Sequence, residues 1–146
     1  MHIVEQVVRP SAEECRRIID RVSLAWEQRQ KSRQRLMTAQ GREIALALPT
    51  GTRLQAGDLL LTPEGWIEVT SASEDVLLIR PRSPQETAFV AYQIGNRHLP
   101  MEIEAQGLKT LYEPILEVYL KQQGIPVERL QAPFTPIGAA FGHRHG

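Results

Sequence analysis

The side chains best suited to chemistry in this sequence are its histidines. The chain has four: His143 and His145 lie in the C-terminal run Phe-Gly-His-Arg-His-Gly, His98 lies in Gly-Asn-Arg-His-Leu-Pro, and His2 follows the first methionine. Imidazole nitrogen is the commonest protein ligand for borderline divalent metals. We therefore take His98, His143 and His145 as candidate metal ligands and interpret His2 as incidental.

The composition favours a soluble cytoplasmic protein that folds without covalent support. The chain has 146 residues, of which 42% are hydrophobic, and its single cysteine, Cys15, excludes both an internal disulfide framework and a cysteine zinc cluster. Seventeen basic and seventeen acidic residues cancel, which argues against a protein that coats nucleic acid. No segment has the length of a membrane-spanning helix, and the N-terminus lacks the pattern of a secretory signal.

Basic residues are concentrated in the first third of the chain. Residues 9–42 contain nine basic and four acidic side chains, and Arg29, Lys31, Arg33 and Arg35 recur at every second position. On a β-strand all four would project from one face. That face is either a solvated surface that discourages edge pairing or a docking strip for an acidic partner.

The first half of the chain reads as a small all-β domain, a sandwich or a barrel-like sheet. Glycine and proline turns separate short segments rich in β-branched residues, and a short helix is possible only at 11–20. The expected strands are 2–8, 22–28, 33–38, 43–48, 58–61 and 66–71.

The second half, from about residue 75, predicts the order β-α-β-β-α-β of a ferredoxin-like domain. Ser83 is the expected cap of a helix over 84–94, with Pro84 at its first turn and Gly95 as its stop. A second helix begins near Pro114 and ends before Gly124. Strands are expected at 76–80, 99–104, 108–112 and 127–130. The predicted fold is therefore α+β, with domains at 1–74 and 75–135 and a flexible, histidine-bearing tail at 136–146.

A metal site built on His98 needs ligands from elsewhere, because one imidazole does not hold an ion strongly. Most homo-oligomers are two-fold dimers, in which two copies of His98 near the axis would converge. His143 and His145 are two positions apart and project to the same side of an extended chain, so they would add ligands. Nickel accepts imidazole in higher coordination, while zinc and copper remain compatible with the same ligands.

An enzyme is not indicated, so no catalytic or cofactor-binding residue is assigned. The sequence contains no Gly-rich phosphate loop with lysine, no Gly-x-Ser-x-Gly and no His-Glu-x-x-His. Metal carried on a terminal segment suits transfer better than catalysis, because catalytic geometry needs rigid support.

Several motifs together resemble the UreE family, the urease accessory nickel metallochaperones. The most specific is Gly95-Asn96-Arg97-His98 followed by Pro100. The supporting motifs are Lys31-Ser32-Arg33, Leu46-Ala47-Leu48-Pro49 with Gly51, Gly57-Asp58-Leu59-Leu60, and Pro133-Phe134-x-Pro136-x-Gly138-Ala139 before the terminal histidines.

The resemblance implies an N-terminal β domain that binds peptide or partner, a ferredoxin-like metal-binding domain, and a homodimer with one histidine per chain meeting at the interface. That histidine matches His98. The resemblance also implies delivery of Ni²⁺ to an apo-urease complex that includes a GTPase. Some members carry extra histidines where this chain has Leu111, Tyr112, Glu113 and Pro114. We therefore expect about one tight ion per dimer.

Two alternatives come from a different class of protein. A ferredoxin-like domain also occurs in RNA-binding modules, and the basic segment offers phosphate contacts, but the strands at 76–80 and 101–104 lack base-stacking aromatics. Alternatively the N-terminal domain is a protein adaptor, and metal binding is secondary.

Overall fold

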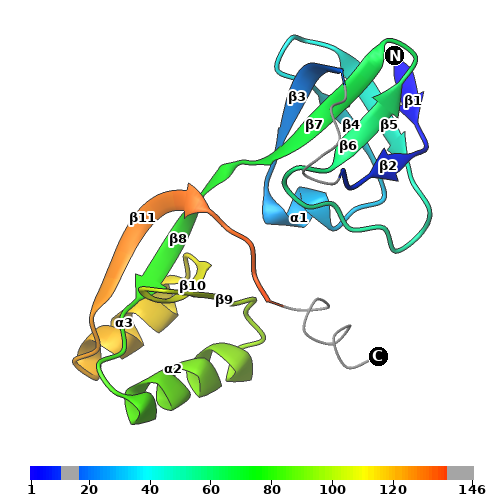
Figure 1. Ribbon diagram of the computed structural model, residues 1–146. Helices are drawn as coiled ribbons and strands as arrows, with labels where there is room; N and C mark the ends of the chain where they lie inside the picture. Colours follow the sequence, from blue (N-terminus) through cyan, green and yellow to red (C-terminus); the bar gives the residue numbers. More distant parts are fainter. Residues whose placement is uncertain (11–16, 138–146) are drawn as a thin grey trace. The chain divides into compact units, whose positions relative to one another are not determined.

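The computed structural model describes residues 1–10 and 17–137, and shows a mixed α+β protein in which strands predominate (Figure 1). It divides into two compact units, Met1–Ala72 and Ser73–Gly146. Two domains and an α+β class were both predicted, and both are confirmed. His143 and His145 lie outside the described residues.

In unit 1, Met1–Ala72, residues 1–10 and 17–72 form two sheets and one helical turn, α1 (Trp26–Arg29). One sheet has the order β1-β5-β4 and the other the order β2-β6-β7-β3. The strands are β1 (His2–Val4), β2 (Val7–Val8), β3 (Ile18–Leu24), β4 (Arg33–Met37), β5 (Glu43–Ala47), β6 (Leu59–Thr62) and β7 (Gly65–Ser71).

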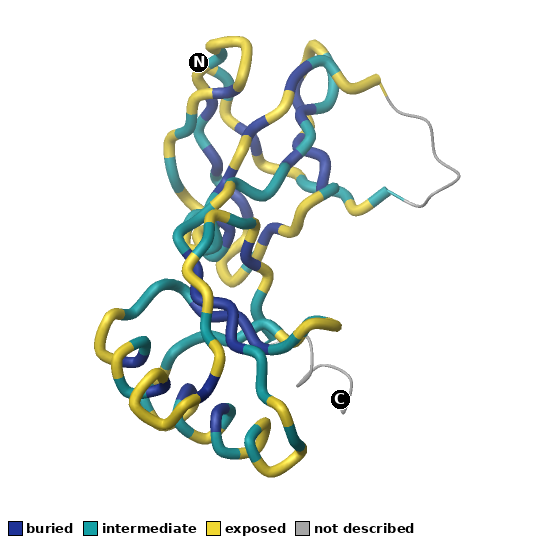
Figure 2. The backbone as a smooth tube through the Cα atoms, turned by 90° about the vertical axis from the view of Figure 1, so that its left-hand side faces the viewer, coloured by how far each residue is buried: buried dark blue, intermediate teal, exposed yellow. Residues whose placement is uncertain are grey.

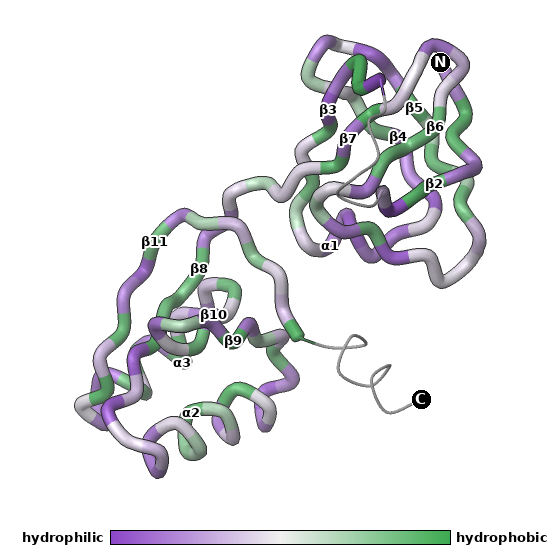
Figure 3. Tube along the Cα trace, viewed as in Figure 1, coloured by the Kyte–Doolittle hydropathy of each residue, from purple (hydrophilic) through white to green (hydrophobic). Residues whose placement is uncertain are grey.

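The two sheets of unit 1 share one hydrophobic core. Val4 and Ile44 come from the first sheet, Leu24, Leu60 and Ile67 come from the second, and all five are fully buried. Hydrophobic stretches along β5 and β6 are visible in Figure 3. Alternating burial along β3 and β5 shows that each sheet turns one face to this core, as half-buried strands do.

Two local predictions in unit 1 were wrong. Residues 26–28 were expected to continue a strand, but they form the turn α1, because Gln28 Oε1 accepts the Ala25 amide at 2.9 Å and Arg29 N–H donates to the Ala25 carbonyl at 3.0 Å. The segment 18–20 was assigned to a possible helix. It is part of β3 and pairs in parallel with β7, as two consecutive isoleucines favour.

The predicted strip of four basic residues on one strand face does not form. Arg29 is buried, with 3% of its surface exposed, and its guanidinium donates to the Leu24 carbonyl at 2.8 Å and to Ser71 Oγ at 3.1 Å. Lys31 lies in the connection before β4. Arg33 and Arg35 are exposed on one strand, and Lys31 is exposed outside it, so two of the four basic residues share a strand face.

As far as Ile137, unit 2 has one antiparallel sheet of order β11-β8-β10-β9, with two helices between its strands. The elements are β8 (Ser73–Ile79), α2 (Pro84–Asn96), β9 (Glu102–Glu104), β10 (Gly107–Leu111), α3 (Pro114–Gln122) and β11 (Val127–Pro133). The helices contribute Val90, Ile94, Leu116 and Leu120 to a core that also contains Leu77 of β8. Buried and exposed residues alternate along the helices in Figure 2, because one face of each helix packs on the sheet.

From Pro133, the last residue of β11, the chain continues across the same unit as a segment that we call the strap, residues 133–137. The Ile137 amide donates to the carbonyl of Met101, just before β9, at 2.7 Å. In Figure 1 the strap runs from the end of β11 toward β9. Pro136 and Ile137 were assigned to a free tail, but this bond attaches them to the sheet domain.

Candidate metal centre

His98 follows α2 at the position where a helix is usually closed by glycine. The His98 amide donates to the Gly95 carbonyl at 3.0 Å, and the Leu99 amide donates to the Ile94 carbonyl at 3.2 Å. These two bonds form a Schellman motif, with Arg97 as the C-cap and His98 as the first residue beyond it. Leu99, the next residue, packs against the hydrophobic core and completes the motif.

The motif holds His98 in the left-handed region, at φ 57°, and no other described residue except glycine has a positive φ. Glycine adopts this conformation freely, whereas a residue with a Cβ is disfavoured by about 1 kcal/mol. The predicted stop at Gly95 was therefore wrong: Gly95 is helical, α2 extends to Asn96, and His98 occupies the closing position. A strained histidine where glycine would be more stable points to a requirement for the imidazole.

Arg97 fixes this end of α2 to α3. Its guanidinium lies over the Tyr119 ring, 5.2 Å from the centroid, and donates to the carbonyl and to Oε1 of Gln93 at 3.1 and 2.8 Å. The Tyr119 ring also contacts Phe89, with 6.3 Å between centroids. Sequence analysis missed this role of Arg97. The two packed helices hold the backbone from which His98 projects.

The His98 side chain is exposed. Over residues 1–10 and 17–137, the structure contains no group of three or more His, Cys, Asp or Glu side chains arranged to hold a metal ion. The described part of a single chain therefore supplies fewer than three such ligands at this position. A shell of three or more protein ligands around His98 would draw on another chain or on residues outside the described ranges.

The strap brings the end of the described chain to the neighbourhood of His98. Ile137 is bonded to Met101, which is three positions after His98. His143 and His145 are six and eight positions beyond Ile137. Since an extended chain advances about 3.3 Å per residue, six residues span roughly 20 Å. Chain length therefore permits His143 and His145 to reach His98.

His2 lies in unit 1, where its Nε2 is 3.4 Å from Glu64 Oε1. A surface contact of this kind contributes little to stability. The interpretation of His2 as incidental stays a prediction.

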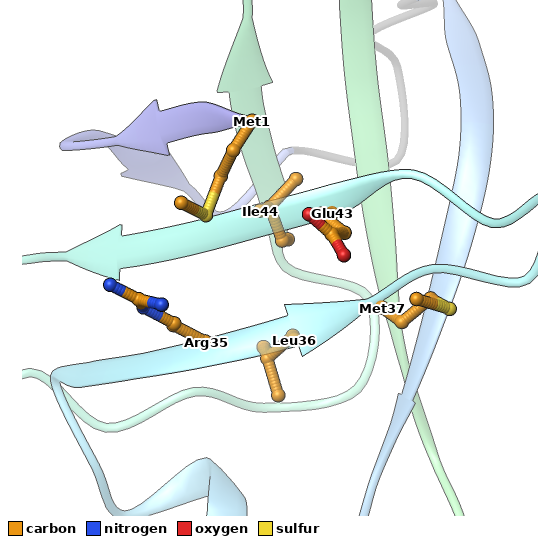
Figure 4. A pocket seen from close by; sticks show the side chains of 6 residues that line it. All are labelled: Met1, Arg35, Leu36, Met37, Glu43 and Ile44. Carbon is orange, nitrogen blue, oxygen red and sulfur yellow. The ribbon is translucent and has the colours of Figure 1, made fainter.

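A pocket of about 290 Å³ in unit 1 is not suited to a metal ion. Figure 4 shows its lining, in which the Met1 and Arg35 side chains extend toward the same end of β5. Glu43 is the one acidic side chain in that lining, which contains no imidazole or thiol. The lining residues are Met1, Arg35, Leu36, Met37, Glu43 and Ile44.

Tyr112, which precedes α3, is part of an ionic cluster in unit 2. Arg129 forms a paired contact with Asp75, at 3.0 and 2.7 Å, and lies 3.7 Å from the centroid of the Tyr112 ring. Tyr112 Oη donates to Glu117 at 2.8 Å. The Arg129 contact lowers the pKa of Asp75, and the Tyr112 hydrogen bond lowers the pKa of Glu117. The carboxylates of this cluster are thus engaged by neighbours rather than open to a metal.

Comparison with known proteins covers both units. Residues 2–72 match the family model described as UreE urease accessory protein, N-terminal domain, and residues 74–146 match the corresponding C-terminal domain. The chain belongs to the UreE family. It is 38% identical over 152 aligned positions to the urease accessory protein UreE of Burkholderia thailandensis, an alignment that covers all of this chain and 71% of that protein. The UreE proteins of Burkholderia pseudomallei strain 1710b and Burkholderia mallei strain SAVP1 are also 38% identical, and the chain covers 75% of each.

Family membership confirms the resemblance carried by Gly95-Asn96-Arg97-His98. The boundary between the two UreE family models coincides with the division into two units near residue 73. Within the described residues, no helix is both long enough and apolar enough to cross a membrane.

Proposed function

We propose that this UreE protein is a cytoplasmic nickel metallochaperone that delivers Ni²⁺ to apo-urease and is not itself an enzyme. The observation that carries the proposal is the exposed His98, kept at a left-handed backbone position where glycine would be more stable. Its position in the Gly-Asn-Arg-His motif, in a chain of a urease accessory family, supports metal binding as the role of that imidazole. The cargo is a metal ion that must be both bound and released.

The proposed coordination shell spans two chains. One His98 per protomer, brought together at the two-fold axis of a homodimer, would form the obligatory ligand pair. The ferredoxin-like unit 2 would then be the dimerisation and metal-binding domain. Support comes from the described part of the chain, which contains no group of three or more His, Cys, Asp or Glu side chains that could hold an ion within one protomer.

His143 and His145 complete the shell in this proposal. Support comes from the strap. The Ile137 amide donates to the carbonyl of Met101, which is three positions after His98, and the chain beyond Ile137 is long enough to return to His98. Six imidazoles per dimer exceed the four of a tetrahedral zinc site and are compatible with the higher coordination of nickel. Zinc and copper would compete for the same ligands in vitro.

The proposed partners of this protein are those that the role of a urease accessory family requires. A urease accessory protein must meet the apo-urease complex, and we propose that this complex includes other accessory proteins, among them a GTPase. Unit 1 is the proposed peptide-binding or partner-binding domain. Neither nucleic acid nor membrane has a part in this function.

Calorimetric titration of the metal-free protein with Ni²⁺ tests the proposal, together with the mass of the protein in solution. The expected result is a dimer that binds about one tight ion per two chains, and a His98→Ala variant that remains folded but loses this binding. His2→Ala is the matched control, because His2 lies in the other unit. Wild-type affinity and stoichiometry in His98→Ala would overturn the assignment of His98.

Transfer is tested separately from binding. Purified apo-urease complex is incubated with Ni²⁺-loaded protein in the presence of a small-molecule chelator that removes free Ni²⁺. Urease activation by the wild-type protein, and none by His98→Ala, is the expected result. Equal activation by both would show that metal delivery does not use this site.

A further inference from the structure

The strap crosses the face of the unit 2 sheet that is opposite the helices. Leu77 points toward the helices, so the neighbouring Leu78 points to the other face. Lys109 is the cross-strand partner of Leu78, and Glu102 is the cross-strand partner of Lys109, so both lie on that face too.

Lys109 connects the strap to two strands. Its Nζ donates to the Pro133 carbonyl at 3.1 Å and lies 3.1 Å from Glu104 Oε2 and 3.6 Å from Glu102 Oε1. Lys109 itself is only 7% exposed. One ammonium group thus joins the last residue of β11 to the two carboxylates of β9.

A second set of contacts holds the rest of the strap. The amide of Thr135 donates to Glu102 Oε1 at 2.9 Å, and the amide of Ile137 donates to the Met101 carbonyl. Phe134, between Pro133 and Thr135, is fully buried. The strap is therefore anchored at alternate residues along its length.

The presence of a lysine at this position is informative. Burying an ammonium group is unfavourable unless it is paired, and an apolar side chain covers a sheet face equally well. What Lys109 adds is a donor that orients the Pro133 carbonyl while its carboxylate partner Glu102 accepts from Thr135. This network specifies the path of the strap.

We propose that Lys109 is a positioning residue for the metal centre: by fixing the strap, it makes the C-terminal segment leave the sheet beside His98. The inference rests on the proposed function, in which His143 shares an ion with His98. With the strap attached, His143 is six positions from the last anchored residue, Ile137; with the strap released, it is ten positions from Pro133. A longer free segment lowers the effective concentration of its imidazoles.

The decisive experiment measures Ni²⁺ affinity of Lys109→Met in two backgrounds, the full chain and a chain ending at Phe141. We expect the substitution to weaken binding about two- to tenfold in the full chain and to leave the truncated chain unchanged. The effect must vanish in the truncated chain because the strap then has no ligands to place. Lys109→Arg, which keeps the charge and the donors, should restore most of the affinity.

A second pair of variants tests the strap without removing the buried charge of Lys109. Thr135→Pro removes the amide that donates to Glu102, whereas Thr135→Ala keeps it, so the two form a matched pair at an exposed residue. Thr135→Pro should behave like Lys109→Met, and Thr135→Ala like the wild type. Lys121→Met is the control for loss of a lysine, because Lys121 pairs only at the surface of α3.

Hydrogen exchange of the metal-free protein measures directly whether the strap is attached to the sheet. The amides of Thr135 and Ile137 should exchange faster in Lys109→Met than in the wild type, while the amide of Leu99 should not change. Unchanged exchange at Thr135 and Ile137 would overturn the proposal before any metal is added.

The possible affinity results separate the two proposals. If truncation weakens binding and neither Lys109→Met nor Thr135→Pro does, the positioning role is wrong and the proposed function stands. Equal weakening by Lys109→Met in both backgrounds also overturns the positioning role, because the lysine would then act without the tail. If truncation itself changes nothing, the role of His143 and His145 in the proposed function fails, and the positioning role fails with it.

Discussion

The amide of Leu99 donates to the carbonyl of Ile94 across the end of α2, and this bond closes the turn that holds His98 in a left-handed conformation. Metal ligands are often presented from loops. Here the proposed ligand, His98, is part of a helix-capping motif, so the orientation of its imidazole depends on the packing of α2 against α3 rather than on a loop of its own.

Substitution at His98 should separate stability from metal binding. His98→Gly should be about 1 kcal/mol more stable than His98→Ala, because glycine adopts φ 57° without strain. Both variants should lose tight Ni²⁺ binding. Urea unfolding of the metal-free variants, followed by circular dichroism, measures the first effect, and calorimetry measures the second. Equal stability of the two variants would contradict the strain argument.

Removal of the terminal histidines should weaken the metal site without abolishing it. A chain ending at Phe141 retains His98, so we expect a dimer that still binds Ni²⁺ with affinity lower by at least about tenfold. The double variant His143→Ala, His145→Ala in the full chain should match the truncation. If truncation abolished Ni²⁺ binding while the His98→Ala variant still bound Ni²⁺ as the wild type does, the assigned roles would be reversed.

Buried Asp20 should make unit 1 sensitive to acid. Burial alone would raise the pKa of Asp20, but donors from Thr38, Arg42 and two backbone amides outweigh it and lower the pKa below its ordinary value of 3.8. A lowered folded pKa gives stability that is present above the unfolded value and is lost as the pH falls toward the folded one.

Asp20→Asn tests this dependence. At pH 7 the variant should be about 2–4 kcal/mol less stable, because Arg42 loses its buried partner, and the gap should narrow below about pH 4. Both tryptophans, Trp26 and Trp66, lie in unit 1, so their fluorescence reports on this unit. A difference in stability between Asp20→Asn and the wild type that stays constant from pH 7 to pH 3 would exclude Asp20 as the source of the acid sensitivity.

Gly107 should tolerate no side chain. It has φ 152°, and an added Cβ would lie 2.1 Å from the Ile79 carbonyl oxygen, so Gly107→Ala should cost about 3 kcal/mol or more. Gly124 is the matched control, since it has φ 76° but open space around its Cα; Gly124→Ala should cost only about 1 kcal/mol. Comparable losses of thermal stability in the two variants would show that β8 and β10 separate easily.

The start of α2 shows what local sequence can predict. Ser83 Oγ accepts the Glu86 amide at 3.0 Å, and Pro84 opens the helix, both as expected from residue type and spacing. The end of α2 was missed because it depends on contacts that are distant in sequence. Arg97 stacks on Tyr119, and Leu99 joins the core, so the helix continues through Gly95.

The candidate site was predictable in its residue types and not in its surroundings. The Gly-Asn-Arg-His motif identified His98, but nothing in it indicated a left-handed backbone. The strap was also missed, since the segment around Phe134 has no periodicity and its attachment depends on Lys109, 24 positions earlier in the chain. A lone lysine in a strand gives no sequence signal that its ammonium group is buried.

The attachment of Ile137 beside β9 has a practical consequence for purification. A polyhistidine tag fused after Gly146 would begin ten positions after Ile137, within roughly 33 Å of extended chain. It would place a surplus of imidazoles within reach of His98 and compete with the natural ligands. Metal stoichiometry should therefore be determined on untagged protein.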